Sequence, residues 1–426
     1  MRSIKEKKGI TLIALAVTIV VILILAGVTI DVTLGENGIL NKSKEAADRM
    51  NNLVKEDEAE LNILLNELNE TMDSNWSGNI DIPDPEPEKP TKVEDVTDIQ
   101  EETVQVEDEY GNKITIPKGF EVVEEEGTTV PEGIVVQDKD SNQFVWIPVG
   151  RVYKDNTGTN YSDIQLGRYT FNTNNGEPTL VQAAYTEANS KNYAQIIKIS
   201  DNFQAGCYEY ATRENPDGIA ANNGTNAIAK NLGGFVDSVK KNRGYYLARY
   251  EASYGSGNSV INYKALSQVS TGTIRTNWST PFSKGMLWNV ITQIDAAKIS
   301  RNTYDEGDNV GVESDLINSY AWDTAIVFIQ EMGNENYANK TSINTVITNT
   351  GTTGDEVCNI NDLASNCFEW TTEYCDRIQP NSTYYHSCTI RGGFQYAGIF
   401  HTATRLSYDP TRADNVFGFR ILLYIK

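Results

Sequence analysis

Residues 10–30 read ITLIALAVTIVVILILAGVTI, and this run decides how the whole chain is organised. It carries no charge over 21 residues. At helical rise such a run spans roughly 32 Å, enough to cross the hydrocarbon of a bilayer. Lys5, Lys7 and Lys8 precede it, and basic residues stay on the cytoplasmic side. The sequence therefore predicts a single-pass protein of the cell membrane with its remaining residues outside the cell.

A glycine separates the basic patch from the apolar run. A cleavable secretory signal would have a shorter apolar run followed by a small-residue site. The arrangement here, KKG followed by ITLIA, instead resembles the leader of type IV prepilins. The resemblance implies cleavage between Gly9 and Ile10 by a prepilin peptidase, methylation of the new N-terminus, and contacts with pilin-type subunits, with the protein in a surface pilus. Ala14 stands where most members have Glu, which favours a minor subunit or a simple anchor; the alternative is an uncleaved signal anchor.

The predicted leader (1–9) and the transmembrane or pilin helix (10–30) are followed by three segments that differ in composition. Residues 31–73 carry leucines at helical spacing and predict a helical stalk. Residues 74–118 are rich in proline and acids. Fifteen acidic residues and four lysines lie between Asp84 and Glu126, which accounts for half of the formal net charge of -22. This predicts a stiff, self-repelling acidic linker, followed by a head over residues 119–426.

The acidic balance, with a sequence pI of 4.6, argues against two classes of partner. Nucleic-acid phosphates would be repelled, and so would an anionic lipid surface. Four of the five cysteines lie within 31 residues. The five are Cys207, Cys358, Cys367, Cys375 and Cys388. The four clustered cysteines could form one or two extracellular disulfides, or the cysteines could be small buried hydrophobic residues, and the spacing leaves both possibilities open.

The head consists of short apolar runs between turn residues. Strands are predicted at 113–117, 133–138, 143–149, 245–252 and 419–425. Two longer runs, 289–300 and 317–332, predict helices. The predicted fold class is therefore α+β: an N-terminal transmembrane or pilin-type helix and stalk, followed by a mixed head with many loops.

Five motifs of the head carry a further resemblance. They are FVWIPVG (144–150), YYLARYEAS (245–253), NINDLASNCFEW (359–370), RGGF (391–394) and TRLSYDPTRADNVFGFRILL (404–423). In this order and spacing they resemble the formylglycine-generating (sulfatase-modifying factor) family, whose fold is an elaborated C-type lectin, over roughly residues 119–426. The resemblance implies a C-type-lectin-like head. Trp146 and Trp370 are expected in its core, because a large indole supplies much buried area in a loop-rich fold.

The catalytic residues of that family are not matched. Its oxygen-using members bind copper through two cysteines shortly after the RGG strand, because soft thiolates select Cu(I). In this chain no cysteine follows Cys388. Iron-dependent relatives need a histidine cluster, and the histidines here are His386 and His401. We therefore expect no enzymatic activity and no catalytic residue.

A calcium site is a separate expectation. In the family a GNVWEW motif supplies carbonyls and a carboxylate to a bound ion, and the matching stretch here is SNCFEW (365–370), with Ser365 in place of the glycine. Asn366 and Glu369 are the candidate ligands, because hard oxygen atoms suit Ca²⁺. The alternative is that Glu369 is a structural carboxylate. No other cofactor is required.

The C-terminal stretch predicts the ligand-binding surface. Ligands of lectin-like folds contact exposed side chains near the C-terminal strands, and mixed aromatic and small polar residues are typical of adaptable recognition surfaces. The candidates are Gln395, Tyr396, Ile399, Phe400, His401, Ser407, Tyr408, Asp409, Thr411 and Asn415. The alternative is that Tyr396, Phe400 and Tyr408 fill a second core.

Together these features predict a surface-exposed, pilin-like or membrane-anchored binding protein of the adhesin or receptor type. Its non-catalytic head would bind an extracellular protein or glycan. One alternative is a surface-tethered enzyme of the formylglycine-generating superfamily, which dependence on copper or iron would favour. Another is a structural pseudopilin of a secretion system, which burial of the 396–415 surface within an assembly would favour.

Overall fold

The computed structural model describes residues 91–183, 207–209, 219–221, 224–259, 262–277, 279–378, 385–393 and 400–426. All of them belong to one unit of the chain, Pro87–Lys426, which we call the head. The predicted leader 1–9, the helix 10–30 and the stalk 31–73 lie outside the described residues. Across the described ranges, no helix is both long enough and apolar enough to cross a membrane.

The head is built mainly from β-strands, which corrects the predicted fold class. We expected an α+β protein with a pilin-type helix, a stalk and a C-type-lectin-like head. The described residues instead form mostly β-sheets, with three short α-helices: α3 (Leu232–Asn242), α4 (Gln293–Thr303) and α5 (Ser319–Glu331). The prediction was wrong because most strands are only two to six residues long. Such strands leave little periodic signal, whereas α4 and α5 lie in long, clearly patterned runs.

The strands are β1 (Val104–Glu107), β2 (Lys113–Ile116), β3 (Phe120–Val122), β4 (Val135–Asp138), β5 (Gln143–Pro148), β6 (Gly150–Tyr153), β7 (Tyr161–Ile164), β8 (Gly167–Phe171), β9 (Pro178–Ala183), β10 (Cys207–Tyr208), β11 (Ile219–Ala221), β12 (Gly224–Asn226), β13 (Gly244–Ala248), β14 (Ser253–Ser256), β15 (Lys264–Leu266), β16 (Val312–Leu316), β17 (Glu356–Val357), β18 (Ile360–Asn361), β19 (Phe368–Ile378), β20 (Tyr385–Arg391), β21 (Arg405–Tyr408), β22 (Phe417–Phe419) and β23 (Ile421–Ile425). Short 3₁₀ helices lie at Val93–Asp95, Glu124–Glu126, Val130–Glu132, Glu306–Asp308 and Tyr337–Asn339.

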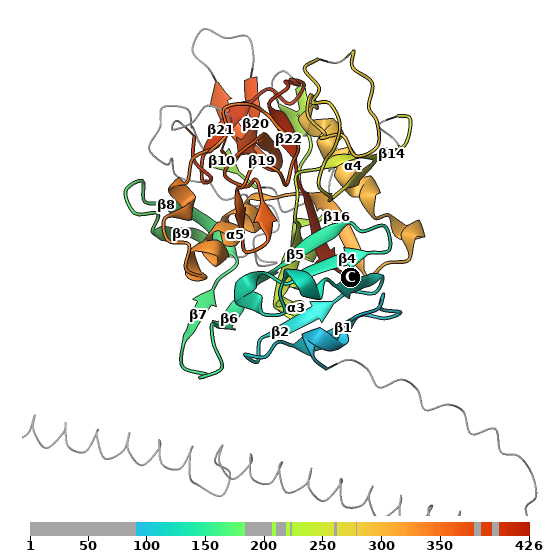
Figure 1. Cartoon of the computed structure of the whole chain (residues 1–426). Coiled ribbons are helices and arrows are strands. Elements are labelled where there is room, and N and C mark those ends of the chain that lie inside the picture. The colour runs from blue at the N-terminus through green and yellow to red at the C-terminus, as the bar shows by residue number, and fades with distance from the viewer. Residues whose placement is uncertain are drawn as a thin grey trace, which may run out of the picture. The chain divides into compact units, whose positions relative to one another are not determined.

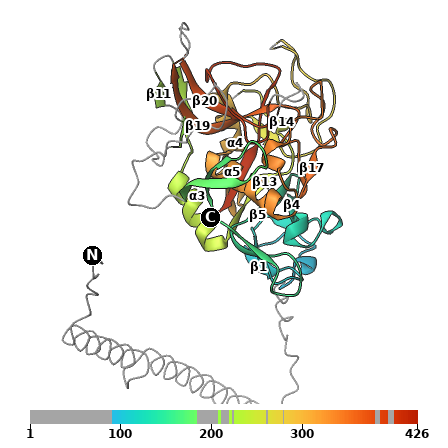
Figure 2. The ribbon, with the colours of Figure 1, turned by 90° about the vertical axis from the view of Figure 1, so that its left-hand side faces the viewer.

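A six-stranded antiparallel sheet, in the order β16-β23-β13-β5-β4-β3, organises the main core (Figures 1 and 2). Neighbouring residues of a strand point to opposite faces. On β13, Tyr245 donates a hydrogen bond to the carbonyl of Ala321 in α5 at 2.6 Å, and its ring lies 5.4 Å from that of Phe235 in α3. The next residue, Tyr246, donates to the carbonyl of Thr115 in β2 at 3.0 Å. Helices α3 and α5 therefore cover one face, and the β1–β2 hairpin lies on the other.

The β1–β2 hairpin lies in the stretch predicted as the end of the acidic linker. Val104, Val106 and Ile116 are buried in the core, and Val104 pairs with Ile116 across the hairpin. Residues 91–118 therefore belong to the head, whereas the prediction placed them in the linker 74–118. In β1 the buried valines alternate with the more exposed Gln105 and Glu107. The linker was predicted from the number of acidic residues, which does not reveal this alternation.

A second sheet carries the C-terminal motifs. Its antiparallel strands lie in the order β10-β19-β20-β21, and β22 pairs in parallel with β19 (β19 to β22 are orange to red in Figure 1). The described residues also form five separate two-stranded sheets, β6–β7, β8–β9, β11–β12, β14–β15 and β17–β18. Trp146 on β5 and Trp370 on β19 are fully buried, which confirms that both tryptophans belong to the core.

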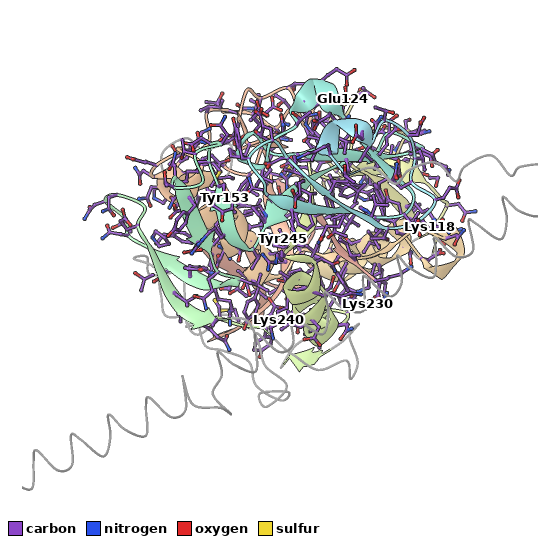
Figure 3. The ribbon with its side chains drawn as sticks, turned by 90° about the horizontal axis from the view of Figure 1, so that it is seen from below. Lys118, Glu124, Tyr153, Lys230, Lys240 and Tyr245 are labelled. Carbon is purple, nitrogen blue, oxygen red and sulfur yellow. The ribbon has the colours of Figure 1, made fainter. Side chains whose placement is uncertain are left out.

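Helix α3 was not predicted from the sequence. Its first turn contains two glycines, which lower helix propensity, and this hides the signal of the buried residues that follow. The helix nevertheless begins at Asn231, whose side chain accepts a hydrogen bond from the backbone N–H of Gly234. Figure 3 shows Lys230 and Lys240 around this helix, and Tyr245 beside it in the interior.

Candidate functional site

The predicted calcium ligand Glu369 is fully buried and is paired with Arg420. Its carboxylate oxygens accept hydrogen bonds from Arg420, at 2.7 Å from Nη2 and at 3.1 and 3.2 Å from Nε. Arg420 also donates to the carbonyls of Ala248 and Asn361, at 2.9 and 2.7 Å. A cation at Glu369 would have to share these oxygens with a guanidinium. In the part of the chain that the structure describes, no cluster of three His, Cys, Asp or Glu side chains is placed to hold a metal, and calcium stays a prediction.

Asn366, the second predicted calcium ligand, fixes a loop. It adopts a φ of 65°, in the left-handed region that asparagine tolerates better than most residues. Its side chain accepts a hydrogen bond from the N–H of Thr348 at 2.8 Å and donates one to the carbonyl of Thr348 at 3.1 Å. The same amide donates to the buried carboxylate of Glu251, which also accepts the N–H of Cys367 at 2.9 Å. Asn366 thus ties a surface loop to a buried acid.

That loop, Thr341–Gly354, reads TSINTVITNTGTTG and contains no charged residue; we call it the charge-free loop. Its second half is anchored by Asp362. The carboxylate accepts hydrogen bonds from the hydroxyl of Thr350 and the N–H of Gly351, both at 2.7 Å, and from the hydroxyl of Thr353. Burial raises the pKa of Asp362, although these three hydrogen bonds oppose the rise. The loop conformation is therefore set by buried groups of the head.

The charge-free loop presents apolar side chains to solvent. Ile343 is 56% exposed and Val346 is 61% exposed. A third exposed residue, Val269, precedes Ser270, whose hydroxyl donates to the side chain of Asn349 in the loop at 3.0 Å. Exposed apolar residues that cluster mark interaction sites more often than isolated ones do. The sequence analysis missed this loop, although fourteen consecutive uncharged residues in so acidic a chain were a usable signal.

Phe400 and His401, both predicted as ligand-binding, lie beside the charge-free loop. His401 forms an antiparallel bridge with Thr341, and its Nδ1 lies 3.0 Å from the carbonyl oxygen of Asn339. The ring of Phe400 packs edge-on against Phe368, with centroids 5.1 Å apart. Both side chains are half-buried. Phe400 therefore packs against the core and also contributes to the surface, so the two alternatives in the sequence analysis each describe part of its environment.

Another group of predicted residues forms a turn after β21, at the other end of that strand from Phe400. Asp409 accepts hydrogen bonds from the N–H and the hydroxyl of Thr411, at 2.8 and 2.6 Å. The guanidinium of Arg412 lies 4.9 Å from the ring centroid of Tyr408. Thr411 is exposed, and Tyr408 and Asp409 are half-buried. The turn is a second, smaller surface with mixed aromatic and polar character.

Of the remaining residues predicted to bind a ligand, one is buried and three lie outside the described residues. Ser407 is buried on β21, opposite Thr389 of β20, and does not reach the surface. Gln395, Tyr396 and Ile399 lie outside the described residues, as do Gly9 and Ile10 of the predicted leader.

Backbone strain accompanies the turn after β21. Val290 has a φ of 55°, which is costly for a β-branched residue. Its N–H donates to the carbonyl of Asp414 at 3.0 Å, and the side chain of Asn289 donates to the carbonyl of Asn415 at 2.7 Å. These two hydrogen bonds connect the strained segment to the turn. The backbone carbonyl of Asn415 therefore helps to hold the turn, and its side chain is half-buried.

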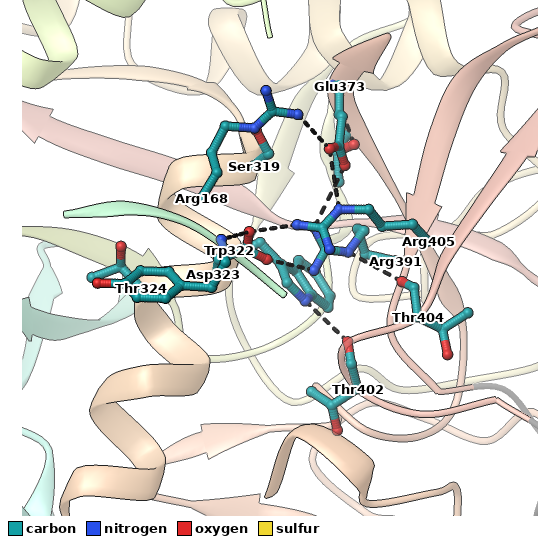
Figure 4. Close-up of polar contacts among 12 residues, drawn as sticks. Arg168, Ser319, Trp322, Asp323, Thr324, Glu373, Arg391, Thr402, Thr404 and Arg405 are labelled. Atoms are coloured by element: carbon teal, nitrogen blue, oxygen red, sulfur yellow. Dashed lines mark hydrogen bonds and ion pairs between the residues drawn. The ribbon is translucent and has the colours of Figure 1, made fainter. Parts of the chain in front are cut away.

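A fully buried ion network holds the strands that carry these residues (Figure 4). Arg168 contacts Glu373 at 2.8 Å, Arg391 contacts Asp323 at 2.6 Å, and Arg405 contacts both acids, at 3.1 Å from Glu373. The five side chains come from β8, α5, β19, β20 and β21. Burial alone would raise the pKa of Glu373, but the three arginines outweigh it and hold the pKa below its ordinary value. The network therefore fastens α5 and β8 to the second sheet.

Glu209, next to β10, is a further buried acid at the edge of this network. Its carboxylate accepts hydrogen bonds from the N–H and hydroxyl of Ser319, at 2.9 and 2.8 Å, and from the hydroxyl of Thr372 at 2.6 Å. Burial raises the pKa of Glu209 to about 7, against the opposing effect of Arg168. A carboxyl group that titrates near neutrality therefore lies inside the head.

The candidate residues that the structure describes lie apart from two cavities of the head. Two cavities of about 420 Å³ lie among the described residues. One is lined by residues such as Lys118 and Tyr304, and the other by residues such as Arg151 and Arg243. None of the predicted ligand-binding residues that the structure describes lines either of these two cavities.

Comparison with known proteins adds little to this description. No protein-family model matches the sequence, and no curated protein matches it. Among solved structures, the chain is similar to "Crystal Structure of CarF", with a TM-score of 0.30 and 12% identity over 43% of this chain and 87% of that one. It is also similar to "Treponema denticola variable protein 1", with a TM-score of 0.25 and 13% identity over 67% of this chain and 96% of that one. Likeness at this level supports no argument about fold or function.

Proposed function

We propose that this is a surface-exposed, pilin-like or membrane-anchored binding protein, and that its head recognises an uncharged extracellular partner, a protein or a glycan, through the charge-free loop with Phe400 and His401. The observation that carries the proposal is the exposure of Ile343 and Val346 on a loop that Asn366 holds at Thr348 and Asp362 holds at Thr350 and Gly351. Removing apolar side chains from water lowers the free energy. Because the head holds these two side chains in solvent on a fixed loop, a partner that covers them would be stabilised by their burial.

The chemistry around the loop supports recognition over catalysis. Threonine hydroxyls and asparagine amides on the loop supply hydrogen-bond donors and acceptors without charge. A fixed loop loses less conformational freedom on binding than a mobile one, which favours affinity. The motif resemblance to the formylglycine-generating family, together with the missing cysteine pair after Cys388, supports a non-catalytic head.

The binding proposal predicts that Ile343→Asp and Val346→Asp each weaken binding at least tenfold without unfolding the head. Both side chains are more than half exposed, so a carboxylate there stays solvated in the free protein, but it must be desolvated in the complex. The measurement is binding of the full-length protein to a printed glycan array and to a panel of immobilised extracellular glycoproteins. Thermal melting checks the fold of each variant.

Leu180→Asp on β9 is the matched control, because Leu180 is another exposed aliphatic residue, at 38%. It should bind as the wild-type protein does. Binding that survives both loop substitutions, or that falls equally with Leu180→Asp, would contradict the proposed surface.

The N-terminal part of the proposal concerns how the head is held at the cell surface. The KKG–ITLIA arrangement and the uncharged run 10–30 support processing as a prepilin and retention of the apolar segment as an anchor. Mass spectrometry of the protein isolated from its own membrane fraction should give a first residue of Ile10, with a methyl group. A chain that still begins at Met1 would exclude the pilin pathway and leave an uncleaved anchor.

A further inference from the structure

Two cysteines that are far apart in the sequence face each other in the second sheet. Strands β10 and β19 are antiparallel, and their register places Cys207 directly opposite Cys375. Directly opposed residues of antiparallel strands have Cα atoms about 4.5–5.5 Å apart, within the range that a disulfide requires. Both side chains are 1% exposed, they form a small apolar cluster of their own, and their thiols are in hydrogen-bond contact.

The sheet places Cys388 away from this pair. Cys388 lies opposite Tyr374 in the β19–β20 register. Because neighbouring residues of a strand point to opposite faces, Cys388 lies on the face opposite to Cys375. The residue after it, Thr389, has its hydroxyl 4.0 Å from the sulfur of Cys207, which places Thr389 on the face of the pair. Cys388 is instead packed in the main core.

We propose that Cys207 and Cys375 form a disulfide that links β10 to β19 when the chain folds in an oxidising environment, with the disulfide of a small thiol or of an oxidoreductase as the oxidant. The sequence analysis considered pairs within the group Cys358–Cys388; the structure joins one member of that group to a cysteine outside it.

The chemistry balances as two thiol–disulfide exchanges. The thiolate of one cysteine attacks a sulfur of the donor disulfide, which forms a mixed disulfide and releases the first donor thiol. The thiolate of the other cysteine then attacks the protein sulfur of the mixed disulfide and releases the second donor thiol. The donor S–S bond gains two electrons, and the two cysteine protons end on the donor thiols.

The folded head protects the pair from late oxidation. The hydrogen bond to Cys375, followed by burial, raises the pKa of Cys207 well above its usual range, and the thiol form is a poor nucleophile. Exchange is therefore faster before β10 docks than after it. Once formed, the link fixes the position of Glu209, two residues further along, against Ser319 and Thr372. This site is separate from the charge-free loop, so its test does not depend on a ligand.

The test is refolding of the full-length protein in detergent with a mixture of reduced and oxidised glutathione, followed by alkylation in denaturant and non-reducing digestion. Mass spectrometry should show a linked pair of peptides that contain Cys207 and Cys375, about 2 Da lighter than the two thiol peptides together. The other three cysteines should be alkylated. Cys388→Ser should keep the link, and the double variant Cys207→Ser/Cys375→Ser should lose it. A link from Cys375 to another cysteine, or five alkylated cysteines, would overturn the proposal.

Thermal melting gives an independent readout. The oxidised wild-type head should melt roughly 5 °C above its reduced form, because the cross-link restricts the unfolded chain. The double variant should melt at the same temperature with and without reductant. Equal melting temperatures for oxidised and reduced wild type would contradict a link in the folded head. If the double variant does not fold, the linked peptides from the wild type and from Cys388→Ser still decide the question.

Discussion

Replacing Glu373 with glutamine is expected to lower the free energy of unfolding of the head by about 3 to 5 kcal/mol, the range found when one partner of a buried ion pair is removed. Glu373 accepts from Arg168 and Arg405, and it contacts Arg391 at 3.5 Å. Without it, Asp323 alone would face three buried guanidinium groups. Glutamine keeps the size of the side chain, so the loss reports charge and not packing. Urea unfolding followed by fluorescence measures it.

Two further variants test this explanation. Asp163→Asn removes a carboxylate of the same kind from an exposed pair, since Asp163 and Arg151 lie 3.3 Å apart with more than 45% of each side chain exposed, and it should change stability little. Arg168→Met removes a cation and balances the network at two charges of each sign. It should therefore destabilise the head less than Glu373→Gln does. If Arg168→Met lowers the free energy of unfolding more than Glu373→Gln does, then repulsion among the three arginines is not the main cause of the loss in Glu373→Gln.

Glu209→Gln is expected to change how the stability of the head depends on pH. The pKa of Glu209 is about 7 in the folded head, raised by burial above its ordinary value near 4.5. Between these two values the folded state keeps a proton that the unfolded state releases. Stability therefore falls as pH rises through this window, by about 3 kcal/mol for this group. Glutamine cannot ionise, so Glu209→Gln should lack that loss.

The diagnostic quantity is the difference in unfolding free energy between Glu209→Gln and the wild type, measured at pH 5 and at pH 8. It should shift in favour of the variant by about 3 kcal/mol between these conditions. A fixed cost from the altered hydrogen bonds to Ser319 and Thr372 cancels in this comparison. Asp163→Asn, which also removes one negative charge, should show no such shift. A difference that is the same at both pH values would show that Glu209 does not titrate inside the head.

The sequence predicted individual elements of the head better than their assembly. The runs at 143–149 and 317–332 correspond to β5 and α5, because one is strongly apolar and the other has clear helical spacing. The β1–β2 hairpin was assigned to a linker because it lies in a stretch rich in acidic residues. Pairing between distant strands, such as β10 with β19, has no local signature, so neither the two sheets nor the Cys207–Cys375 contact was predictable.

The candidate site was predictable only in part. Phe400, His401 and Tyr408 were found from their composition, and the structure places them at least partly at the surface. Asn366 and Glu369 were recognised as important, but their partners, Thr348 and Arg420, could not be known without the fold. The sequence alone does not distinguish a glutamate that pairs with an arginine from one that binds a metal ion. The five side chains of the buried network likewise come from five separate elements.

The place of β23 in the central sheet affects when the head can fold. This strand lies between β16 and β13 and pairs with both, yet it follows every other strand of that sheet in the chain. The sheet is therefore incomplete on the ribosome until residue 425 has been synthesised. Until then β13 and β16 lack their common neighbour, and the central sheet of the head cannot be completed. If the chain is exported as proposed, a secretion channel that accepts only unfolded polypeptide would receive it before its central sheet has formed.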